Sequence, residues 1–243
     1  MSGHSHAKTV KATKDANAAI KGKIFSKMAR LISLAAKEGG NIEFNAKLKS
    51  AVETAKKFNM PKDNIERAIK KGTGELEGEK LETILIEILG PNGINVIVEG
   101  ITDNKNRTMG EVKQIAQKRN CKIANEGSVK WQFDQMGIIV TQTIEATKKE
   151  SFEMLAIEAG ALDLSWQNED EQDYLEILTK PEELAIVKKS LEEKGLAVET
   201  ATLGWVAKEE IEATESDKKI AENLFEDLNE NDSVQEMYSN LKS

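Results

Sequence analysis

Residues 174–203, YLEILTKPEELAIVKKSLEEKGLAVETATL, carry the pattern that decides the fold of this chain. The run Tyr174–Leu178 is short and largely apolar, which predicts a strand. A helical pattern follows over about 181–194; it opens with a proline, which suits the first turn of a helix, and ends before a glycine. Leu196–Thr202 then predicts a second strand. The stretch is therefore expected to form a strand–helix–strand unit.

The residues before this unit show the same order of elements. Ile138–Thr141 predicts a strand, a helical pattern covers about 148–159, and Leu162–Trp166 predicts another strand. The resulting order βαββαβ over residues 137–203 is typical of a ferredoxin-like domain. A further short strand is expected at Gly204–Ala207.

The sequence on both sides of this domain predicts a second α+β region, which includes two strands joined by the turn Pro91-Asn92-Gly93. The expected elements are strand Thr83–Leu89, strand Ile94–Ile101, a helix capped by Thr108, strand Ser128–Phe133, and helices near 216–228 and 232–239.

Three short amphipathic helices are expected before residue 72. The first begins at Lys23 and ends at Gly39-Gly40, Asn45 can cap the second, and Pro61 opens the third, which Gly72 ends. Because each apolar face needs a partner, the three helices should form a small bundle. Three glycines between residues 72 and 78 predict a linker after it.

Charge divides the chain near residue 71. The whole chain has a net charge of −8, yet residues 1–71 hold 16 of the 34 basic residues and only six of the 42 acidic ones. The first 71 residues therefore carry a net charge of +10 and the remainder −18. This contrast favours a polyanion-binding module, because the acidic part would repel phosphates. A set of solvated lysine-rich helices is the plainer interpretation of the same pattern.

Other classes of function find little support in the sequence. Cys121 is the single cysteine, and the two histidines, His4 and His6, lie near the N-terminus, so neither a Cys–His nucleophile nor a metal site is expected. The glycines at 72, 74 and 78 lack the ending of a phosphate-binding loop. No apolar run approaches the roughly 20 residues that span a bilayer, and the N-terminus lacks a secretory pattern. We expect a cytoplasmic protein that is not an enzyme and uses no cofactor or metal.

Six motifs in order along the chain resemble the YebC/PmpR family, and the resemblance runs nearly end to end. They are Gly3-His4-Ser5, KIFSK at Lys23–Lys27, MPKDNIERAI at Met60–Ile69, TDNKNRT at Thr102–Thr108, Gly127-Ser128-Val129, and DSVQEMYSN at Asp232–Asn240. The chain departs from the family after Gly-His-Ser, where members usually have Lys-Trp and this chain has His6-Ala7-Lys8. The stacking contact that a tryptophan supplies to a base therefore has no counterpart here.

The resemblance implies an α+β multidomain fold with three domains. Residues 1–75 would form a basic helical N-terminal domain, 79–136 plus 204–243 an α+β domain, and 137–203 a ferredoxin-like domain inserted into the α+β domain.

The resemblance also implies a nucleic-acid-binding gene-expression factor of the YebC type. Some members are named DNA-binding transcriptional regulators, others resemble ribosome-associated translation factors, and mitochondrial members activate translation of a cytochrome oxidase subunit. No base-reading pattern is evident in the basic helices, which favours recognition of structured RNA. We expect a ribosomal RNA ligand, the ribosome as partner and no membrane partner. A DNA-binding transcriptional regulator is the alternative, and the oligomeric state stays open.

Two sets of residues are candidates for binding. The basic set consists of Lys8, Lys11, Lys14, Lys21, Lys23, Lys27 and Arg30, whose charges meet phosphates without reading sequence. The second set is a polar docking loop of Thr102, Asp103, Asn104, Asn106 and Arg107, in which Arg107 would be free to pair with a phosphate. A self-bonded turn is the alternative for this loop, because Asp and Asn side chains bond nearby backbone.

Aromatic residues of the predicted ferredoxin-like domain are a third candidate surface. Trp166 and Tyr174 lie on adjacent predicted strands, where RNA-binding sheets carry stacking aromatics. Acidic residues between them would repel RNA, so we expect these side chains to pack in the core.

Overall fold

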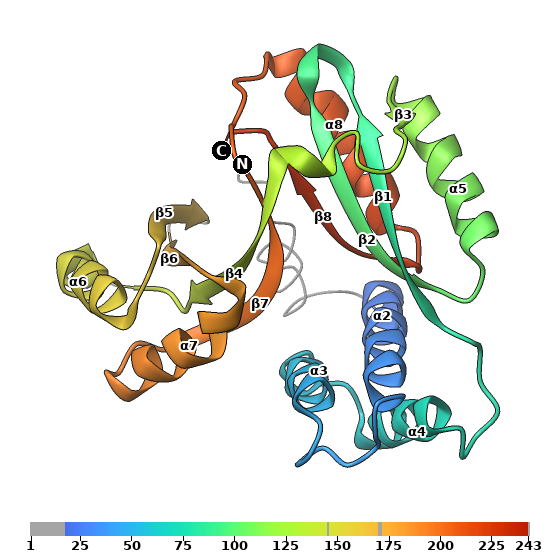
Figure 1. The fold of residues 1–243 in the computed structure, drawn as a ribbon, viewed down its shortest axis with the longest axis horizontal. Coiled ribbons are helices and arrows are strands. Elements are labelled where there is room, and N and C mark those ends of the chain that lie inside the picture. The colour runs from blue at the N-terminus through green and yellow to red at the C-terminus, as the bar shows by residue number, and fades with distance from the viewer. Residues whose placement is uncertain (1–17, 145, 170–171, 243) are drawn as a thin grey trace. The chain divides into compact units, whose positions relative to one another are not determined.

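The computed structural model describes residues 18–144, 146–169 and 172–242, and the chain divides into two compact units (Figure 1). Unit 1 contains residues 1–130 and 210–243, and unit 2 contains residues 131–209. Among the described residues, unit 1 has two hydrophobic clusters, one among its N-terminal helices and one on its sheet, whereas unit 2 has a single cluster. The fold is α+β, as the sequence predicts.

The N-terminal part of unit 1 is a three-helix module, confirming the predicted bundle (Figure 1). Asn45 caps the second helix as predicted, because its side-chain oxygen accepts a hydrogen bond from Leu48 N at 3.0 Å. Its amide also donates to Ala35 O and Gly39 O at 2.8 Å each, so one side chain closes the end of one helix and the start of the next. The helices are α2 (Ala18–Ala36), α3 (Ala46–Lys57) and α4 (Lys62–Thr73).

Gly72 lies inside α4, so the prediction that it ends the helix was wrong. The C-cap is Gly74, with a left-handed φ of 81°. A Cβ atom on Gly72 would lie 2.3 Å from Ser33 O, and Ser33 Oγ donates to Ala68 O at 2.8 Å. The glycine is therefore needed for the close approach of α2 and α4, a packing requirement that looks like a helix stop in the sequence.

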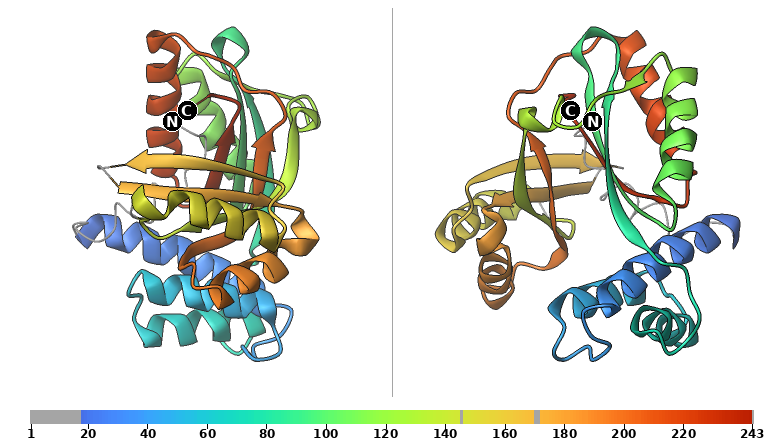
Figure 2. Two further views of the ribbon diagram at one scale, coloured as in Figure 1. Left: turned by 90° about the vertical axis from the view of Figure 1, so that its left-hand side faces the viewer. Right: turned by 45° about the vertical axis from the view of Figure 1, so that its right-hand side comes forward.

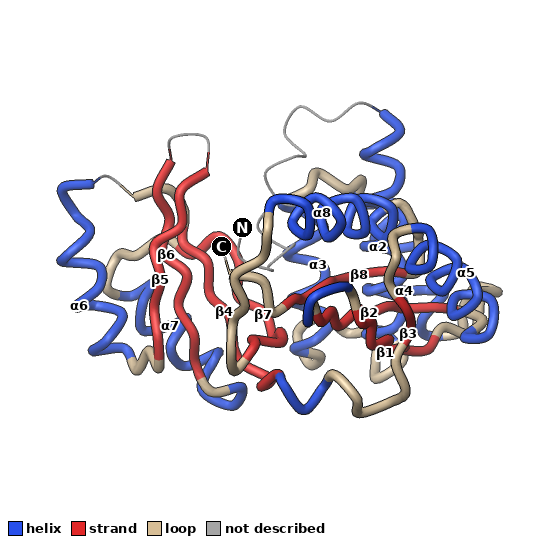
Figure 3. Tube along the Cα trace, turned by 90° about the horizontal axis from the view of Figure 1, so that it is seen from above, coloured by secondary structure: helices blue, strands red, loops and turns tan. Residues whose placement is uncertain are grey.

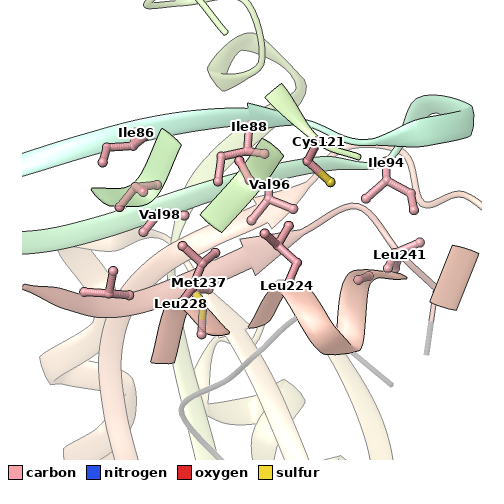
Figure 4. Close-up of a cluster of buried hydrophobic side chains, with 14 of the residues drawn as sticks. Ile86, Ile88, Ile94, Val96, Val98, Cys121, Leu224, Leu228, Met237 and Leu241 are labelled. Carbon is pink, nitrogen blue, oxygen red and sulfur yellow. The ribbon is translucent and has the colours of Figure 1, made fainter. Parts of the chain in front are cut away.

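The rest of unit 1 is a four-stranded antiparallel sheet with strand order β3-β1-β2-β8. The hairpin at Pro91–Gly93 sets the register between its two central strands from Glu82↔Thr102 to Leu89↔Asn95, close to the predicted strands. Helices α5 and α8 cover one face of the sheet (Figure 2), and Figure 4 shows the apolar side chains between them. The elements are β1 (Glu82–Leu89), β2 (Asn95–Thr102), α5 (Lys105–Lys118), β3 (Lys122–Ile123), α8 (Glu215–Asn229) and β8 (Val234–Ser239).

Two predictions for this region were wrong. Residues 232–239 do not form a helix; they include β8, which pairs with β2 from Val96↔Ser239 to Gly100↔Val234. The segment is too short for its sequence to distinguish helix from strand, and the unpaired edge of β2 decides the outcome. The strand predicted at 128–133 is instead a turn and a short 3₁₀ segment, Lys130–Gln132, before β4 begins at Phe133.

Glu87 accounts for the turn. Its side chain is only 3% exposed, and its carboxylate accepts hydrogen bonds from Gly127 N at 2.6 Å, Val129 N at 2.5 Å and Lys130 N at 2.8 Å. Burial raises the pKa of the Glu87 carboxyl, but the three backbone donors and the Lys130 charge outweigh burial, so its pKa lies below its usual value. Three backbone donors turned toward one carboxylate cannot also serve a strand ladder, which is why the predicted strand does not form.

Unit 2 has the element order β4-α6-β5-β6-α7-β7 and the antiparallel strand order β5-β6-β4-β7, which confirms the ferredoxin-like prediction. Figure 3 shows α6 and α7 beside the strands, and both helices contribute to the core of the unit. The two strands predicted at 196–202 and 204–207 form one strand. The elements are β4 (Phe133–Thr141), α6 (Lys149–Ala159), β5 (Asp163–Glu169), β6 (Gln172–Thr179), α7 (Leu184–Glu193) and β7 (Val198–Ala207).

Candidate nucleic-acid interface

The predicted basic residues fall into three groups in the structure. Lys8, Lys11 and Lys14 lie outside the described residues. Lys21 lies in the first turn of α2 and is exposed. The remaining three, Lys23, Lys27 and Arg30, follow each other at four and three residues along α2, which places them on one face of the helix.

Lys27 is buried, with only 6% of its surface exposed. Its ammonium group donates to Asn229 Oδ1 at 2.8 Å and to Asn229 O at 3.1 Å, at the end of α8. Burial lowers the pKa of Lys27 below its usual value, although the carboxylates of Glu236, Asp232 and Glu230 raise it in part. A lysine in this environment positions α2 and cannot reach a phosphate while these contacts hold.

The two neighbours of Lys27 on this face make similar contacts. Arg30 Nη1 donates to Ile101 O at 2.9 Å and to Ser233 Oγ at 3.1 Å, and Lys23 forms an ion pair with Glu230. All three residues therefore tie α2 to the second part of unit 1, mainly around the connection between α8 and β8. A basic helix face has the same sequence pattern whether it faces a phosphate or an acidic turn, so the sequence alone could not distinguish these roles.

A cleft of about 420 Å³ lies between α2 and α4 and contains basic residues that the prediction did not include. Lys37 lines it from just after the end of α2, and Arg67 and Lys71, one turn apart, line it from α4. Lys37 Nζ donates to Leu81 O. Within residues 18–144, 146–169 and 172–242, the side chains of Arg67 and Lys71 form no hydrogen bond or ion pair, and both are exposed. The signal that could have found them is their spacing of four residues beside Ala68, an inward position of the amphipathic helix.

The loop Thr102–Arg107 is a self-bonded helix start. Asn104 caps α5 by accepting a hydrogen bond from Arg107 N at 3.0 Å, so the prediction that Thr108 caps this helix was wrong. Thr108 is buried instead, and its hydroxyl lies 2.8 Å from that of Thr102. Asn106 is exposed in the first turn of α5.

Arg107 already has acidic partners, whereas the prediction left it free to pair with a phosphate. It forms an ion pair with Asp103, and its Nε lies 3.7 Å from Glu111 Oε1. The side-chain hydrogen bond from Arg107 lowers the pKa of the Asp103 carboxyl. These contacts match the alternative of a self-bonded turn.

In unit 2, Trp166 packs against the hydrophobic cluster, in agreement with the expected core role. Its indole N–H donates to Glu153 Oε1 at 2.5 Å, and the Lys149 ammonium lies 4.7 Å from the ring centre. One edge and one face of the ring are thereby engaged within the unit, which leaves it unsuited to stacking on a base.

The described residues supply little for other kinds of site. Cys121 is buried, which raises the pKa of its thiol and makes it a poor nucleophile. The described residues contain no group of three or more metal-binding side chains placed to hold an ion. Among these same residues, no helix is both long and apolar enough to cross a membrane.

Comparisons with known proteins place nearly the whole chain in one family of similar sequences. Residues 5–75 match the family model described as the TACO1/YebC protein N-terminal domain, and residues 81–241 match the TACO1/YebC second and third domain. A relative from Caldanaerobacter subterraneus subsp. tengcongensis, named "Probable transcriptional regulatory protein TTE1135", is 43% identical over 100% of this chain and 98% of its own length. A relative of the same general name from Thermotoga maritima is 42% identical over 100% of this chain and 94% of its own.

A solved structure is also similar. The crystal structure of the conserved hypothetical protein Aq1575 from Aquifex aeolicus has a TM-score of 0.83 and 39% sequence identity, covering 93% of this chain and 91% of that one. The two family models together cover nearly every residue, and the full-length relatives exceed 40% identity. The chain therefore belongs to the TACO1/YebC family.

Proposed function

We propose that this protein is a nucleic-acid-binding gene-expression factor that acts in translation by binding ribosomal RNA through its helical module. The observation that carries the proposal is the pair Arg67 and Lys71, two exposed cations on one face of α4 with no acidic partner among the described residues. They belong to a segment of net charge +10 on an otherwise acidic chain. Cations left unpaired beside many carboxylates favour an anionic ligand.

The contact set that we propose differs in part from the seven basic residues that the sequence predicts. Lys8, Lys11, Lys14 and Lys21 stay in the set, and Arg67 and Lys71 join it. Lys23, Lys27 and Arg30 become positioning residues, because their charged groups already bond to residues of the same unit. RNA is favoured over duplex DNA because the unpaired cations line a cleft, whereas a sequence-specific DNA reader presents base-contacting side chains on a protruding helix.

A DNA-binding transcriptional regulator is the second candidate. It is favoured by the names of the relatives, which describe them as probable transcriptional regulatory proteins. Charge does not discriminate between the two candidates, since phosphates are common to RNA and DNA.

The test is cosedimentation of the full chain with ribosomes in a sucrose gradient at physiological salt, with duplex DNA as competitor. The double variant Arg67→Glu/Lys71→Glu should stay at the top of the gradient while the wild type travels with ribosomes. The matched control is Lys113→Glu/Lys219→Glu, which makes the same charge change at two exposed helical positions of unit 1 outside the module. It should sediment like the wild type.

The salt dependence adds a second readout. Neutral variants Arg67→Gln/Lys71→Gln should reduce the slope of log affinity against log salt by about 1.4 on a single-stranded RNA, because two phosphate contacts are lost. If duplex DNA strips the wild type from ribosomes, the translation role fails and the DNA-binding candidate replaces it. If the control variant loses binding as fully as the cleft variant, binding follows net charge alone and the assignment to the module fails.

A further inference from the structure

The cleft between α2 and α4 is lined by small side chains on its inner side. On α2 these are Gly22, Ser26, Ala29 and Ser33, spaced by three or four residues along one face, and α4 adds Ala68 and Gly72. The two helices approach each other closely at Gly72, where a Cβ atom would collide with Ser33 O. Small residues elsewhere in this lining leave space that larger side chains would fill, and that space forms the cleft.

The wall of the cleft combines an aromatic ring with polar groups. Phe25 lines it and is only half-buried, with part of its surface against the core of the module. Ser26 and Asn64 also line it, and their hydroxyl and amide groups can donate and accept hydrogen bonds. An aromatic face next to donors and acceptors is the arrangement that proteins use to hold an unstacked base.

The charges lie on the same cleft. Arg67 and Lys71 are unpaired among the described residues, and Glu79 is the one acidic residue in the lining. Arg30 and Lys37 also line it, but their charged groups bond to the carbonyl oxygens of Ile101 and Leu81. Two unpaired cations suffice for one phosphate and its neighbour along a strand.

The size of the cleft selects the form of the ligand. A volume of about 420 Å³ lies in the range of pockets that take a small ligand or a single nucleotide unit. A base inside a duplex presents only its edges in the grooves, so its flat face cannot reach Phe25. An unpaired nucleotide in a loop, bulge or single strand offers its face, its edge and its phosphate together.

We propose that this cleft binds one unpaired nucleotide of a nucleic-acid strand, with the base against Phe25 and with its phosphate and the neighbouring phosphate at Arg67 and Lys71. This inference rests on the proposed nucleic-acid-binding function and adds a preference for unpaired over paired strands, as well as the residues that produce it. Ser26 and Asn64 supply hydrogen bonds to the base edge. The charges draw any polyanion to the module, and the cleft retains the strand that has a free base.

The experiment measures binding of the full chain to a fluorescent 12-nucleotide RNA, single-stranded or in a blunt duplex, by anisotropy. Ser26→Leu fills the cleft without changing charge, and Ser50→Leu on the exposed face of α3 is its matched control. Ser26→Leu should weaken single-strand binding about tenfold, the size of one lost base contact, and leave duplex binding unchanged. Ser50→Leu should change neither. Thermal melting of each variant establishes that it is folded.

A second variant tests stacking directly and does not depend on filling the cleft. Phe25→Leu keeps an apolar side chain and removes the ring, so a 2-aminopurine base in the single strand, quenched on binding to the wild type, should stay bright. If the wild type binds single strand and duplex equally and Ser26→Leu changes neither, the cleft proposal is overturned while nucleic-acid binding stands. If the wild type binds no RNA and no ribosome, the proposed function fails, and the cleft proposal fails with it.

Discussion

Replacing Glu87 by glutamine should destabilise unit 1 more than its single-atom change suggests. The Glu87 carboxylate accepts three backbone N–H groups, and its side chain is almost wholly buried. In Glu87→Gln one carboxylate oxygen becomes an NH₂ group, which faces an N–H donor and leaves at least one buried donor unsatisfied. The negative charge that strengthens the remaining bonds is also lost.

The expected cost follows from these losses. A hydrogen bond to a charged group contributes about 1.5–3 kcal/mol, and an unsatisfied buried donor costs about 1–3 kcal/mol, with overlap between the two. We expect Glu87→Gln to lower the free energy of unfolding by about 2–4 kcal/mol, a large share of the roughly 5–15 kcal/mol of a typical domain. Urea unfolding, followed by a signal from unit 1 and with the m-value checked for change, measures it.

The stability difference between wild type and Glu87→Gln should also depend on pH, in a direction that the lowered pKa of Glu87 determines. Because the pKa of Glu87 is lower in the folded chain than in the unfolded chain, the ionised carboxylate stabilises the fold above the unfolded pKa of about 4.3. That contribution is lost as pH falls toward the lower folded pKa, so the gap between wild type and Glu87→Gln should narrow below about pH 4. Glu82→Gln on the same strand, with a half-exposed side chain paired to Lys105, is the control and should cost under about 1 kcal/mol. A cost for Glu87→Gln below about 1 kcal/mol, or a gap that widens in acid, would refute this reasoning.

Three further predictions follow from single positions. Gly72→Ala should lower the free energy of unfolding by more than about 2 kcal/mol, measured by heat or urea, because its Cβ would lie 2.3 Å from Ser33 O. The control Gly110→Ala, which has open space around it in α5, should raise the free energy of unfolding by about 0.5–1 kcal/mol. Equal effects of the two substitutions would contradict the close approach of α2 and α4. Asn104→Ala should lower the free energy of unfolding by about 1 kcal/mol through loss of the cap on α5, and a change near zero would mean that the cap is dispensable. Lys27→Met tests a lowered pKa: the unfolded chain binds the Lys27 proton more tightly, so wild type should gain stability relative to the variant as pH rises toward the unfolded pKa of about 10.4, and a relative loss would contradict it.

Local patterns predicted the parts of the fold that local interactions determine. The ferredoxin-like order of unit 2 and the three helices of the module follow from apolar periodicity and from caps such as Asn45, all of which act within a few residues. β8 was missed because its conformation depends on β2, more than 130 positions earlier in the chain. A six-residue strand at a sheet edge has no pattern of its own strong enough to reveal that partner.

The sequence predicts the basic charge of the candidate site, but it predicts only some of the residues that we now propose for it. The excess of basic residues predicts that the helical module binds nucleic acid, and this stays a prediction; three of the predicted cations, all on α2, bond instead to the connection between α8 and β8 and to β2. Arg67 and Lys71 were missed because composition does not show which cations have acidic partners. The cleft itself depends on the crossing of α2 and α4 at Gly72, a contact between segments about 40 residues apart that no sequence spacing encodes.

The two ends of the ferredoxin-like insertion are paired with each other, and this pairing determines which inserted segments the rest of the fold can accept. Phe133 at its start is the register partner of Ala207 at its end, and Lys208 N donates to Gln132 O at 2.9 Å. The chain thus enters and leaves the inserted domain at points about one strand spacing apart, roughly 5 Å. For the sheet of unit 1, the inserted domain is therefore equivalent to a short hairpin turn. The loop-closure entropy of such a turn does not grow with the number of residues that fold beyond it. Segments of very different length or surface chemistry can be grafted at this ribbon, because the host core receives the same two chain ends whatever lies past them.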